Sequence, residues 1–257
     1  MKRIRVIPVL LIHDGGLVKS VQFKKYRYVG DPINAVKIFN EKEVDEIIVL
    51  DISATVERRK PNIEMIKEIA GEAFMPLAYG GGIRTIEEVK TLIASGVEKV
   101  VINAAAVDTP NLIQEASQYV GSQSVVVSID VKKNIWGKYR IATHNSKRIT
   151  KLDPVSFAKK MEEHGAGELF INAVDKDGTY KGYDLELIKE ISQSVRIPVV
   201  ACGGAASIED LKKAAVHGAS AVAAGSMFVF QRPHQAVLIS YPSQEELKTN
   251  LFKYLPE

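Results

Sequence analysis

Two glycine pairs in the sequence could let the backbone approach an anionic ligand. Gly81-Gly82 and Gly203-Gly204 each follow a short apolar run and precede a helical pattern. Glycine has no Cβ, so the chain can come close to a ligand, and the free amides that open a helix favour an anion. Each pair is combined with the residues that end the next apolar run, which gives Gly81, Gly82, Asn103 and Ala104 in one set and Gly203, Gly204, Gly225 and Ser226 in the other. Two such sets predict two phosphate sites and an elongated substrate phosphorylated at both ends; the alternative is that the glycines only form tight turns.

Several ionisable side chains stand where apolar runs end. Asp130 could act as a general acid or base, or it could be a carboxylate that caps a helix or orients a hairpin. Lys19 follows Gly15-Gly16 and could hold an anionic group, with a solvated loop lysine as the alternative. Asp51 and Asp177-Gly178 also lie at such ends. We place Asp177 and Gly178 with the substrate-binding residues, although Asp-Gly is first of all a turn signal.

Four charged residues lie at the opposite ends of apolar runs: Arg5, Glu46, Lys99 and Glu168. In a strand alternate residues share a face, which puts Arg5 with Ile7, Val9 and Leu11. The four charges alternate in sign and could ring the floor of a barrel, paired because burial demands it. Charges that point outward into solvent are an equally open interpretation.

Short β-branched runs alternate with amphipathic helical stretches, which is typical of repeated βα units and a parallel sheet. A length of 257 residues suits one (β/α)8 barrel, which needs about 250. We therefore expect a single α/β domain over residues 1–257, a TIM barrel. The eight expected strands are Arg5–Leu11, Glu46–Ile52, Pro76–Tyr79, Lys99–Asn103, Ser124–Asp130, Glu168–Val174, Pro198–Ala201 and Ala221–Ala224.

An internal repeat favours the barrel over an open sheet. The segment from Gly81 to Glu88 returns as Gly203 to Asp210, an offset of 122 residues, close to half the chain. Two half-barrels of four strands, about 1–122 and 123–257, account for this offset. Between the fifth expected strand and the next helix, residues 132–147 alternate in polarity and predict a β-hairpin. A flap over the substrate and a hairpin without function are both open for this segment.

Composition excludes several classes of protein. The net charge of +3 is mixed along the chain and gives no nucleic-acid footprint. The apolar run near the N-terminus is too short to span a membrane. Cys202 is the only cysteine, so a disulfide within the chain is impossible and a cytoplasmic location is expected. The five histidines are unclustered, so we expect no metal site and no cofactor.

As an ordered set, these residues resemble the cyclase subunit of imidazole glycerol phosphate synthase. The resemblance covers nearly the whole chain, through Asp14-Gly15, Val18-Lys19, Gly30-Asp31-Pro32, Asp45-Glu46, Leu50-Asp51-Ile52, Gly80-Gly81-Gly82-Ile83, Ile102-Asn103, Val125 to Asp130, Gly165-Ala166-Gly167-Glu168 and Asp175-Lys176-Asp177-Gly178-Thr179. It implies a separate glutaminase subunit at the N-terminal face of the barrel, whose ammonia enters the floor and reaches a bisphosphate ribonucleotide at the rim. It also implies that Arg5, Glu46, Lys99 and Glu168 form the entrance gate, and that two phosphate clamps include Gly82, Asn103, Gly204 and Ser226.

The chain departs from the family at one catalytic position. The family uses two aspartates for acid–base work, one ending the first strand and one ending the fifth. Asp130 matches the second, whereas Leu11 stands in place of the first. Leucine cannot move a proton, and a positioned acid or base contributes about 10²–10⁴ in rate. His13 lies two residues on and could substitute if the strand extends that far; a solvated loop histidine is the alternative.

This departure is similar to an offshoot of the family, the cyclase-like proteins of surface-polysaccharide gene clusters. The resemblance implies ammonia delivery for sugar amidation, with an aminosugar amidotransferase or ligase as a further partner. A genuine cyclase of histidine biosynthesis, a non-catalytic conduit or glutaminase activator, and a sugar-phosphate isomerase are the alternatives. We expect a small phosphorylated substrate and neither a nucleic acid nor a membrane as partner.

Overall fold

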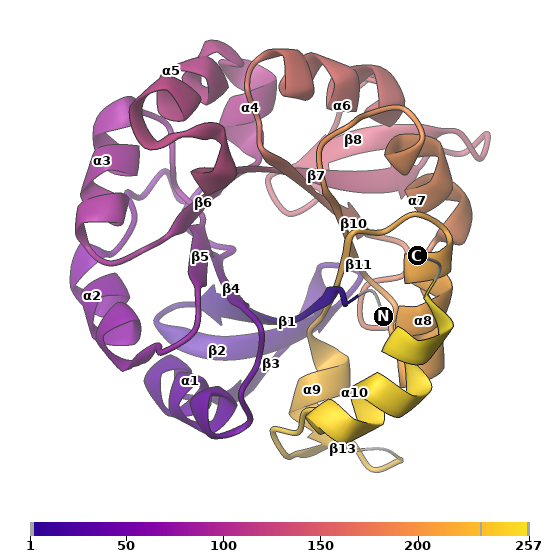
Figure 1. The fold of residues 1–257 in the computed structure, drawn as a ribbon. Helices are drawn as coiled ribbons and strands as arrows, with labels where there is room; N and C mark the ends of the chain where they lie inside the picture. Colours follow the sequence, from indigo (N-terminus) through magenta and orange to yellow (C-terminus); the bar gives the residue numbers. More distant parts are fainter. Residues whose placement is uncertain (1–2, 232, 256–257) are drawn as a thin grey trace.

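Eight parallel strands close into a barrel in the computed structural model, which describes residues 3–231 and 233–255 (Figure 1). Their order around the barrel is β1-β4-β5-β6-β7-β10-β11-β12, and β12 pairs with β1 to close it. The fold is the (β/α)8 barrel that the sequence predicts. The strands are β1 (Arg5–His13), β4 (Ile47–Asp51), β5 (Leu77–Gly80), β6 (Lys99–Ile102), β7 (Val125–Lys133), β10 (Glu168–Ala173), β11 (Val199–Cys202) and β12 (Ala221–Ala224).

Helices surround the barrel, and six of those that cover it begin at side-chain caps. Asp31, Asn62, Thr85, Asp153, Asp184 and Ser207 each accept a hydrogen bond from an amide of the first turn, which satisfies a donor that the helix leaves free. The helices are α1 (Pro32–Glu41), α2 (Ile63–Glu72), α3 (Ile86–Ala94), α4 (Ala104–Asp108), α5 (Asn111–Val120), α6 (Pro154–Glu163), α7 (Leu185–Ser192), α8 (Ile208–Val216), α9 (Ser226–Val229) and α10 (Gln244–Asn250), with 3₁₀ turns η1 (Ser122–Ser124) and η2 (Phe252–Tyr254).

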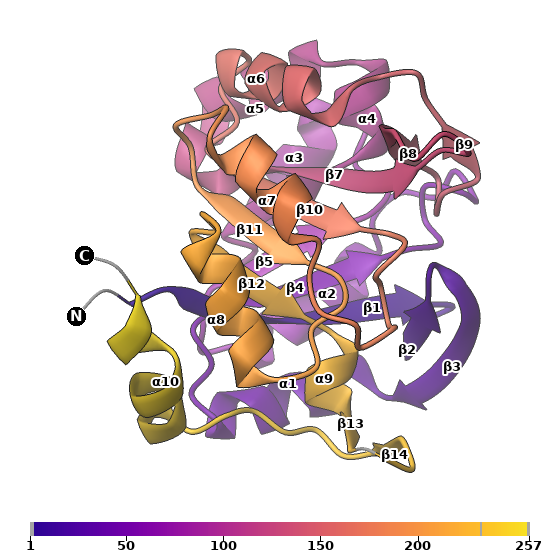
Figure 2. The same cartoon turned by 90° about the vertical axis from the view of Figure 1, so that its right-hand side faces the viewer.

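Two hairpins extend from the C-terminal ends of barrel strands, on the side of the barrel away from the chain termini (Figure 2). The hairpin of β2 (Gly16–Val21) and β3 (Lys24–Gly30) continues β1, and β8 (Tyr139–Thr143) with β9 (Arg148–Ile149) continues β7. The second hairpin confirms the prediction for residues 132–147. The first was not predicted, and it lengthens β1 to His13 because the added residues pair with β2. A small ladder of β13 (Phe230–Gln231) and β14 (Ala236–Val237) follows α9.

The barrel interior is an apolar core separate from the core beneath the helices. Ile7, Val9, Ile48, Ala78, Val101, Val126, Phe170 and Val200 are among its buried members, and Leu11 and Leu50 close its upper end. The alternation along β1 and β6 is the one expected, because Ile7 and Val9 share the interior with Val101. A column of packed, mostly hydrocarbon side chains therefore separates the two ends of the barrel.

The repeat seen in the sequence has a structural counterpart. Helices α3 and α8 are each nine residues long and start 122 residues apart. Thr85 and Ser207, at the same offset, cap them in the same way. The two helices thus repeat at the offset seen in the sequence, and the division into two half-barrels stays a prediction.

Candidate active site

Two adjoining cavities open among the C-terminal ends of the strands. The first, of about 90 Å³, includes Gly81, Asn103 and Asp130, and the second, of about 30 Å³, includes Lys19, Asp177, Gly225 and Ser226. Leu11, Ser20, Phe23, Leu50 and Asn172 line both. The two cavities thus form one elongated site, with predicted residues from each half of the barrel at its two ends.

Asp130 lies in the first cavity, at the point where β7 leaves the barrel. Asn103 at the end of β6 donates a hydrogen bond to its carboxylate, over 3.2 Å. The pKa of Asp130 is raised to about 7, mainly by burial and also by the negative charge of Asp177, while the bond from Asn103 opposes both effects. A carboxyl group with this pKa can accept or give a proton near neutral pH, which is what acid–base catalysis requires. Asp130 caps no helix among the described residues, whereas it does stand at the base of the β7–β8 hairpin. Its assignment as an acid–base group stays a prediction.

Lys19 is a buried residue of β2, so the interpretation as a solvated loop lysine is wrong. Pairing of Val18 with Leu11 draws this strand over the barrel mouth, and the Lys19 ammonium donates to the carbonyl of Val9 over 2.5 Å. Burial lowers the pKa of Lys19 to about 8, although the charge of Asp177 acts in the opposite direction. Gly225 leaves room for this ammonium, because a Cβ there would lie 2.8 Å from Lys19 Nζ.

Asp177 joins the β2–β3 hairpin to the loop after β10. Its carboxylate accepts from the Ser20 hydroxyl over 3.1 Å, and its carbonyl accepts from the Gln22 amide over 3.0 Å. Burial raises the pKa of Asp177, opposed by Ser20 and by the charge of Lys19. The hairpin is thereby held closed over the second cavity.

The glycine loops are explained in part by packing. A Cβ on Gly81 would lie 2.2 Å from the carbonyl oxygen of Asp51, and one on Gly204 would lie 2.2 Å from that of Gly182. A Cβ on Gly82 or on Gly203 would also lie close to a backbone oxygen, at 2.8 Å in each case. Tight packing of the βα loops therefore requires glycine with or without a ligand, and the two phosphate sites remain a prediction. Gly82, Ala104, Gly178, Gly203 and Gly204 do not line either cavity.

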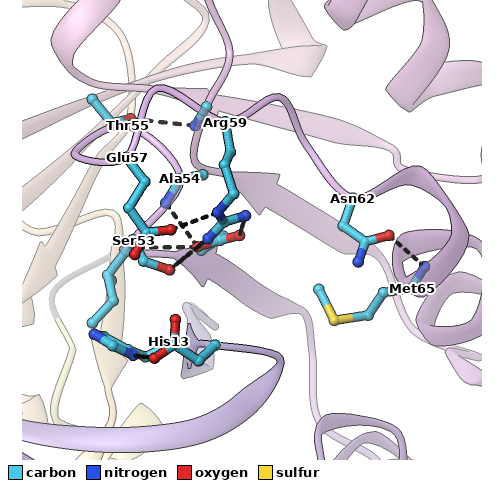
Figure 3. A network of polar contacts seen from close by, with 12 residues as sticks. His13, Ser53, Ala54, Thr55, Glu57, Arg59, Asn62 and Met65 are labelled. Atoms are coloured by element: carbon cyan, nitrogen blue, oxygen red, sulfur yellow. Dashed lines mark hydrogen bonds and ion pairs between the residues drawn. The ribbon is translucent and has the colours of Figure 1, made fainter.

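Asp51 lines the first cavity, but its carboxylate is bound by its own loop. That carboxylate accepts from the amides of Ser53 and Ala54, each over 3.0 Å, and from the guanidinium of Arg59 over 3.2 Å. Arg59 also donates to Ser53 and Glu57 (Figure 3). These contacts fix the loop after β4, so Asp51 positions that loop and has few lone pairs left for a substrate.

Leu11 lies between the two cavities and points into both. Strand β1 does extend as far as His13, yet the His13 imidazole lies outside both cavities. It contacts Asp14 through Nδ1 over 2.9 Å and stacks on Tyr26 with ring centroids 5.0 Å apart. The His13 side chain therefore does not reach the place between the cavities that Leu11 occupies.

Several lining residues were not predicted. Asn172 is buried in β10, and its Oδ1 has no hydrogen-bond donor in the described residues. His144 and Asn145, from the turn between β8 and β9, reach the first cavity, and Asn145 donates to the carbonyl of Ile52 over 2.7 Å. The hairpin after β7 thus contributes to the cavity wall. A hairpin signal was present in the sequence, but no local pattern shows which distant strand end it reaches.

The four charged residues at the other end of the barrel form a closed ring of ion pairs. Glu46 and Glu168 are buried, and each contacts both Arg5 and Lys99. The Lys99 ammonium lies 2.9 Å from Glu46 and 3.1 Å from Glu168. Exposed, outward-facing charges are therefore the wrong interpretation for this set. The ring lies directly below the apolar interior, because Ile7, Ile48 and Val101 share the faces of its members.

Replacing Asp130 by asparagine is expected to stabilise the protein at pH 8 by about 1–3 kcal/mol. The unfolded carboxyl ionises near its ordinary pKa of 3.8, whereas the folded one holds its proton to about 7. The wild type therefore loses stability as pH rises from about 4 to 7, by at most about 4 kcal/mol. Loss of the charged bond from Asn103 offsets about 1.5–3 kcal/mol of the gain. Urea unfolding from pH 4 to 8 tests this: a gain for Asp130→Asn that does not grow with pH contradicts the raised pKa.

None of the helices in the described part of the chain is long and apolar enough to cross a membrane. Among the same residues, no three His, Cys, Asp or Glu side chains are grouped to hold a metal ion. Cys202 is a buried free thiol beside the second cavity, and burial raises its pKa well above the ordinary value.

The chain is similar in sequence to proteins of one known family. Residues 5–233 match the family described as histidine biosynthesis protein. A Pseudomonas aeruginosa protein, provisionally described as imidazole glycerol phosphate synthase subunit hisF2, is 52% identical over 251 residues, which cover 96% of this chain and 99% of the relative. Imidazole glycerol phosphate synthase subunit HisF of Endomicrobium trichonymphae is 44% identical over 231 residues (90% and 89%), and that of Petrotoga mobilis is 44% identical over 225 residues (87% and 89%).

Proposed function

Since the chain belongs to the histidine biosynthesis protein family, we propose that it is an ammonia-using barrel subunit that works with a glutaminase and serves sugar amidation in surface-polysaccharide synthesis. The observation that carries the proposal is the pairing of a charged ring at the floor with a leucine at the rim. The chain resembles the cyclase subunit of imidazole glycerol phosphate synthase, and this resemblance supports the use of ammonia together with a glutaminase. The assignment to sugar amidation rests on Leu11.

The floor ring supports entry of ammonia from a glutaminase on that face. Glu46 and Glu168 bind both cations, so a small movement of Lys99 would open a path while Arg5 still binds both carboxylates. Above the ring the interior is lined with hydrocarbon. An apolar passage disfavours a charged ammonium ion and favours neutral ammonia, because desolvation penalises the charged form.

The rim cavities support an anionic substrate. In our proposal the Lys19 ammonium, beside Gly225 and Ser226, holds one phosphorylated end, while the loops at Gly81-Gly82 and Asn103-Ala104 hold the other. Gly203-Gly204 and Asp177-Gly178 complete the two ends as loop backbone. Asp130, with its pKa near 7, exchanges a proton with the reacting centre between them.

Leu11 supports a reaction other than ring closure. A cyclase needs a second proton-transfer group opposite Asp130, and the side chain that faces both cavities there is hydrocarbon. Ammonia that reaches this point meets one carboxyl group, and Leu11 with Leu50 extends the apolar path to the rim. Delivery of ammonia to an aminosugar amidotransferase or ligase fits this arrangement. The same arrangement also fits a barrel that catalyses no reaction of its own and only conducts ammonia and activates the glutaminase.

A competing function is the ordinary cyclase of histidine biosynthesis. The relatives from Endomicrobium trichonymphae and Petrotoga mobilis carry that name, and Asp130 is present. Glutaminase binding does not separate the two functions. Turnover of the bisphosphate ribonucleotide with free ammonia does, because our proposal expects a rate far below that of a cyclase.

Exposed aromatic residues beside the floor ring offer the first test. Phe74 follows α2 and is 88% exposed, and Tyr119 lies near the end of α5 and is 58% exposed. Both are on the floor side of the barrel. A shallow pocket joins Tyr119 to Lys99. Phe74→Ala is expected to weaken binding of the purified glutaminase about tenfold or more, because exposed aromatics at an interface centre carry much of its energy. Titration calorimetry and glutamine hydrolysis measure the effect.

The matched control is Tyr28→Ala, which removes an aromatic side chain that is 68% exposed on the rim side. It should leave glutaminase affinity unchanged. A wild-type chain that neither binds nor stimulates a glutaminase would rule out the proposed function.

A further inference from the structure

The hairpin after β7, here called the cationic arm (residues 131–152), concentrates positive charge on one side of the molecule. It holds seven lysine and arginine residues and no aspartate or glutamate. The whole chain has a net charge of only +3, so the remainder is net negative. Within residues 3–231 and 233–255, Arg148 is the one cation of the arm in an ion pair, with Asp108 over 2.6 Å. The other six have no carboxylate partner in the fold.

The arm also exposes its largest apolar side chains. Ile135 and Trp136 form its tip and are 89% and 78% exposed, and Ile149 on β9 is 49% exposed. The tip is held in place rather than loose, because the Asn134 side chain accepts from the amides of Trp136 and Lys138, each over 3.0 Å. A fixed, exposed tryptophan among cations that mostly lack a carboxylate partner is typical of a binding surface, since Trp and Arg are enriched where proteins meet.

The shape of this surface favours a protein over a membrane. Trp136 and Ile149 wall a hollow whose edge carries Lys138, Arg140 and Lys151. A hollow rimmed by cations can accept a protruding side chain and pair with the carboxylates around it. A bilayer surface has no protruding apolar side chain to fill the hollow while carboxylates pair with the cations around it.

We infer that the cationic arm is the docking surface for an acidic protein, the enzyme that accepts ammonia from this barrel. The inference rests on the proposed function, which requires such an acceptor at the rim. The arm lies on the face of the barrel opposite the chain termini and the charged floor (Figure 2). Its turn residues His144 and Asn145 line the first cavity, so a protein seated on the arm would lie beside the mouth from which ammonia leaves.

Photocrosslinking in cells that express the full chain can test the inference. Benzoylphenylalanine at position 136 is expected to crosslink one acidic protein, which is identified by mass spectrometry, purified and titrated with the wild-type chain. Trp136→Ala and the charge reversal Lys138→Glu are each expected to weaken that binding about tenfold or more. Raising the salt from about 50 to about 300 mM should weaken it as well, because exposed charges are screened.

The control is Lys25→Glu, which reverses an exposed charge on the other rim hairpin and should leave the affinity unchanged. A second probe at Phe74 tests the floor separately, because it should capture the glutaminase. One outcome is that the glutaminase is captured at Phe74 while no purified partner binds wild type more tightly than Trp136→Ala. That outcome overturns the docking surface and leaves the proposed function intact. Binding of phosphatidylglycerol vesicles or of an oligonucleotide by the arm, in place of a protein, also overturns it.

Discussion

Leu11→Asp is expected to raise the rate of imidazole glycerol phosphate formation from free ammonia by about 10²–10⁴-fold, the contribution of one positioned acid or base. Leu11 faces both rim cavities, and Asp130 lines the first of them. The new carboxylate would lie across the site from a carboxyl group whose pKa is already about 7. The assay uses the purified barrel, excess ammonia and the bisphosphate ribonucleotide.

Leu11→Asn is the control that separates proton transfer from polarity. It introduces an amide with the same shape as the aspartate carboxylate. An amide cannot exchange a proton in this way, so the rate should stay at the wild-type level. Leu11→Asp combined with Asp130→Asn should lose the gain, because both groups are then needed. A wild-type rate already at the level of a cyclase, with no gain from Leu11→Asp, would show that the chain closes the imidazole ring without this group.

The strands and the floor ring could be predicted because both depend on local periodicity. Each barrel strand is a short apolar run, and the alternation along β1 puts Arg5 on the same face as Ile7. Once a barrel is expected, the positions of Glu46, Lys99 and Glu168 at strand starts bring them to one end. The pairing itself follows from burial, because two carboxylates removed from water need cations beside them.

The first hairpin was missed because β3 has no apolar alternation. Lys24–Gly30 is mostly exposed, with lysine, arginine and tyrosine side chains. The tight turn that joins β1 to β2 was nevertheless readable, since Asp14-Gly15 adopts positive φ at both residues and such a pair favours a two-residue hairpin turn. Missing the hairpin also hid the burial of Lys19, which arises from pairing of β2 with β1.

The cavity wall could be predicted only in part. Asp130 and Asn103 end their strands, and the barrel rule brings strand ends together. Asn172 lies within an apolar strand, where one polar residue is an ordinary exception. Asn145 reaches the loop after β4 through a chain separation of more than ninety residues. No local pattern records such a contact.

Lys99→Met is expected to lower the free energy of unfolding by about 3 kcal/mol and to uncouple the barrel from its glutaminase. Breaking a buried ion pair costs about 3–5 kcal/mol, and the lower end applies because Glu46 and Glu168 keep Arg5. Two carboxylates then share one guanidinium, so the ring no longer has the balance of charge that closes the floor. Urea unfolding measures the first effect. The second is measured in the proposed sugar-amidation reaction, as the ratio of turnover with glutamine to turnover with free ammonia, which is expected to fall.

Lys37→Met is the matched control, since it removes a lysine from an exposed pair with Glu72 at 3.2 Å. Exposed pairs contribute about 0–1 kcal/mol, so this variant should unfold almost as the wild type does and keep the turnover ratio. If Lys99→Met destabilises the chain but leaves that ratio unchanged, the ring stabilises the floor and does not gate it. The two measurements therefore separate a structural ring from an entrance, because only an entrance makes the use of glutamine-derived ammonia depend on Lys99.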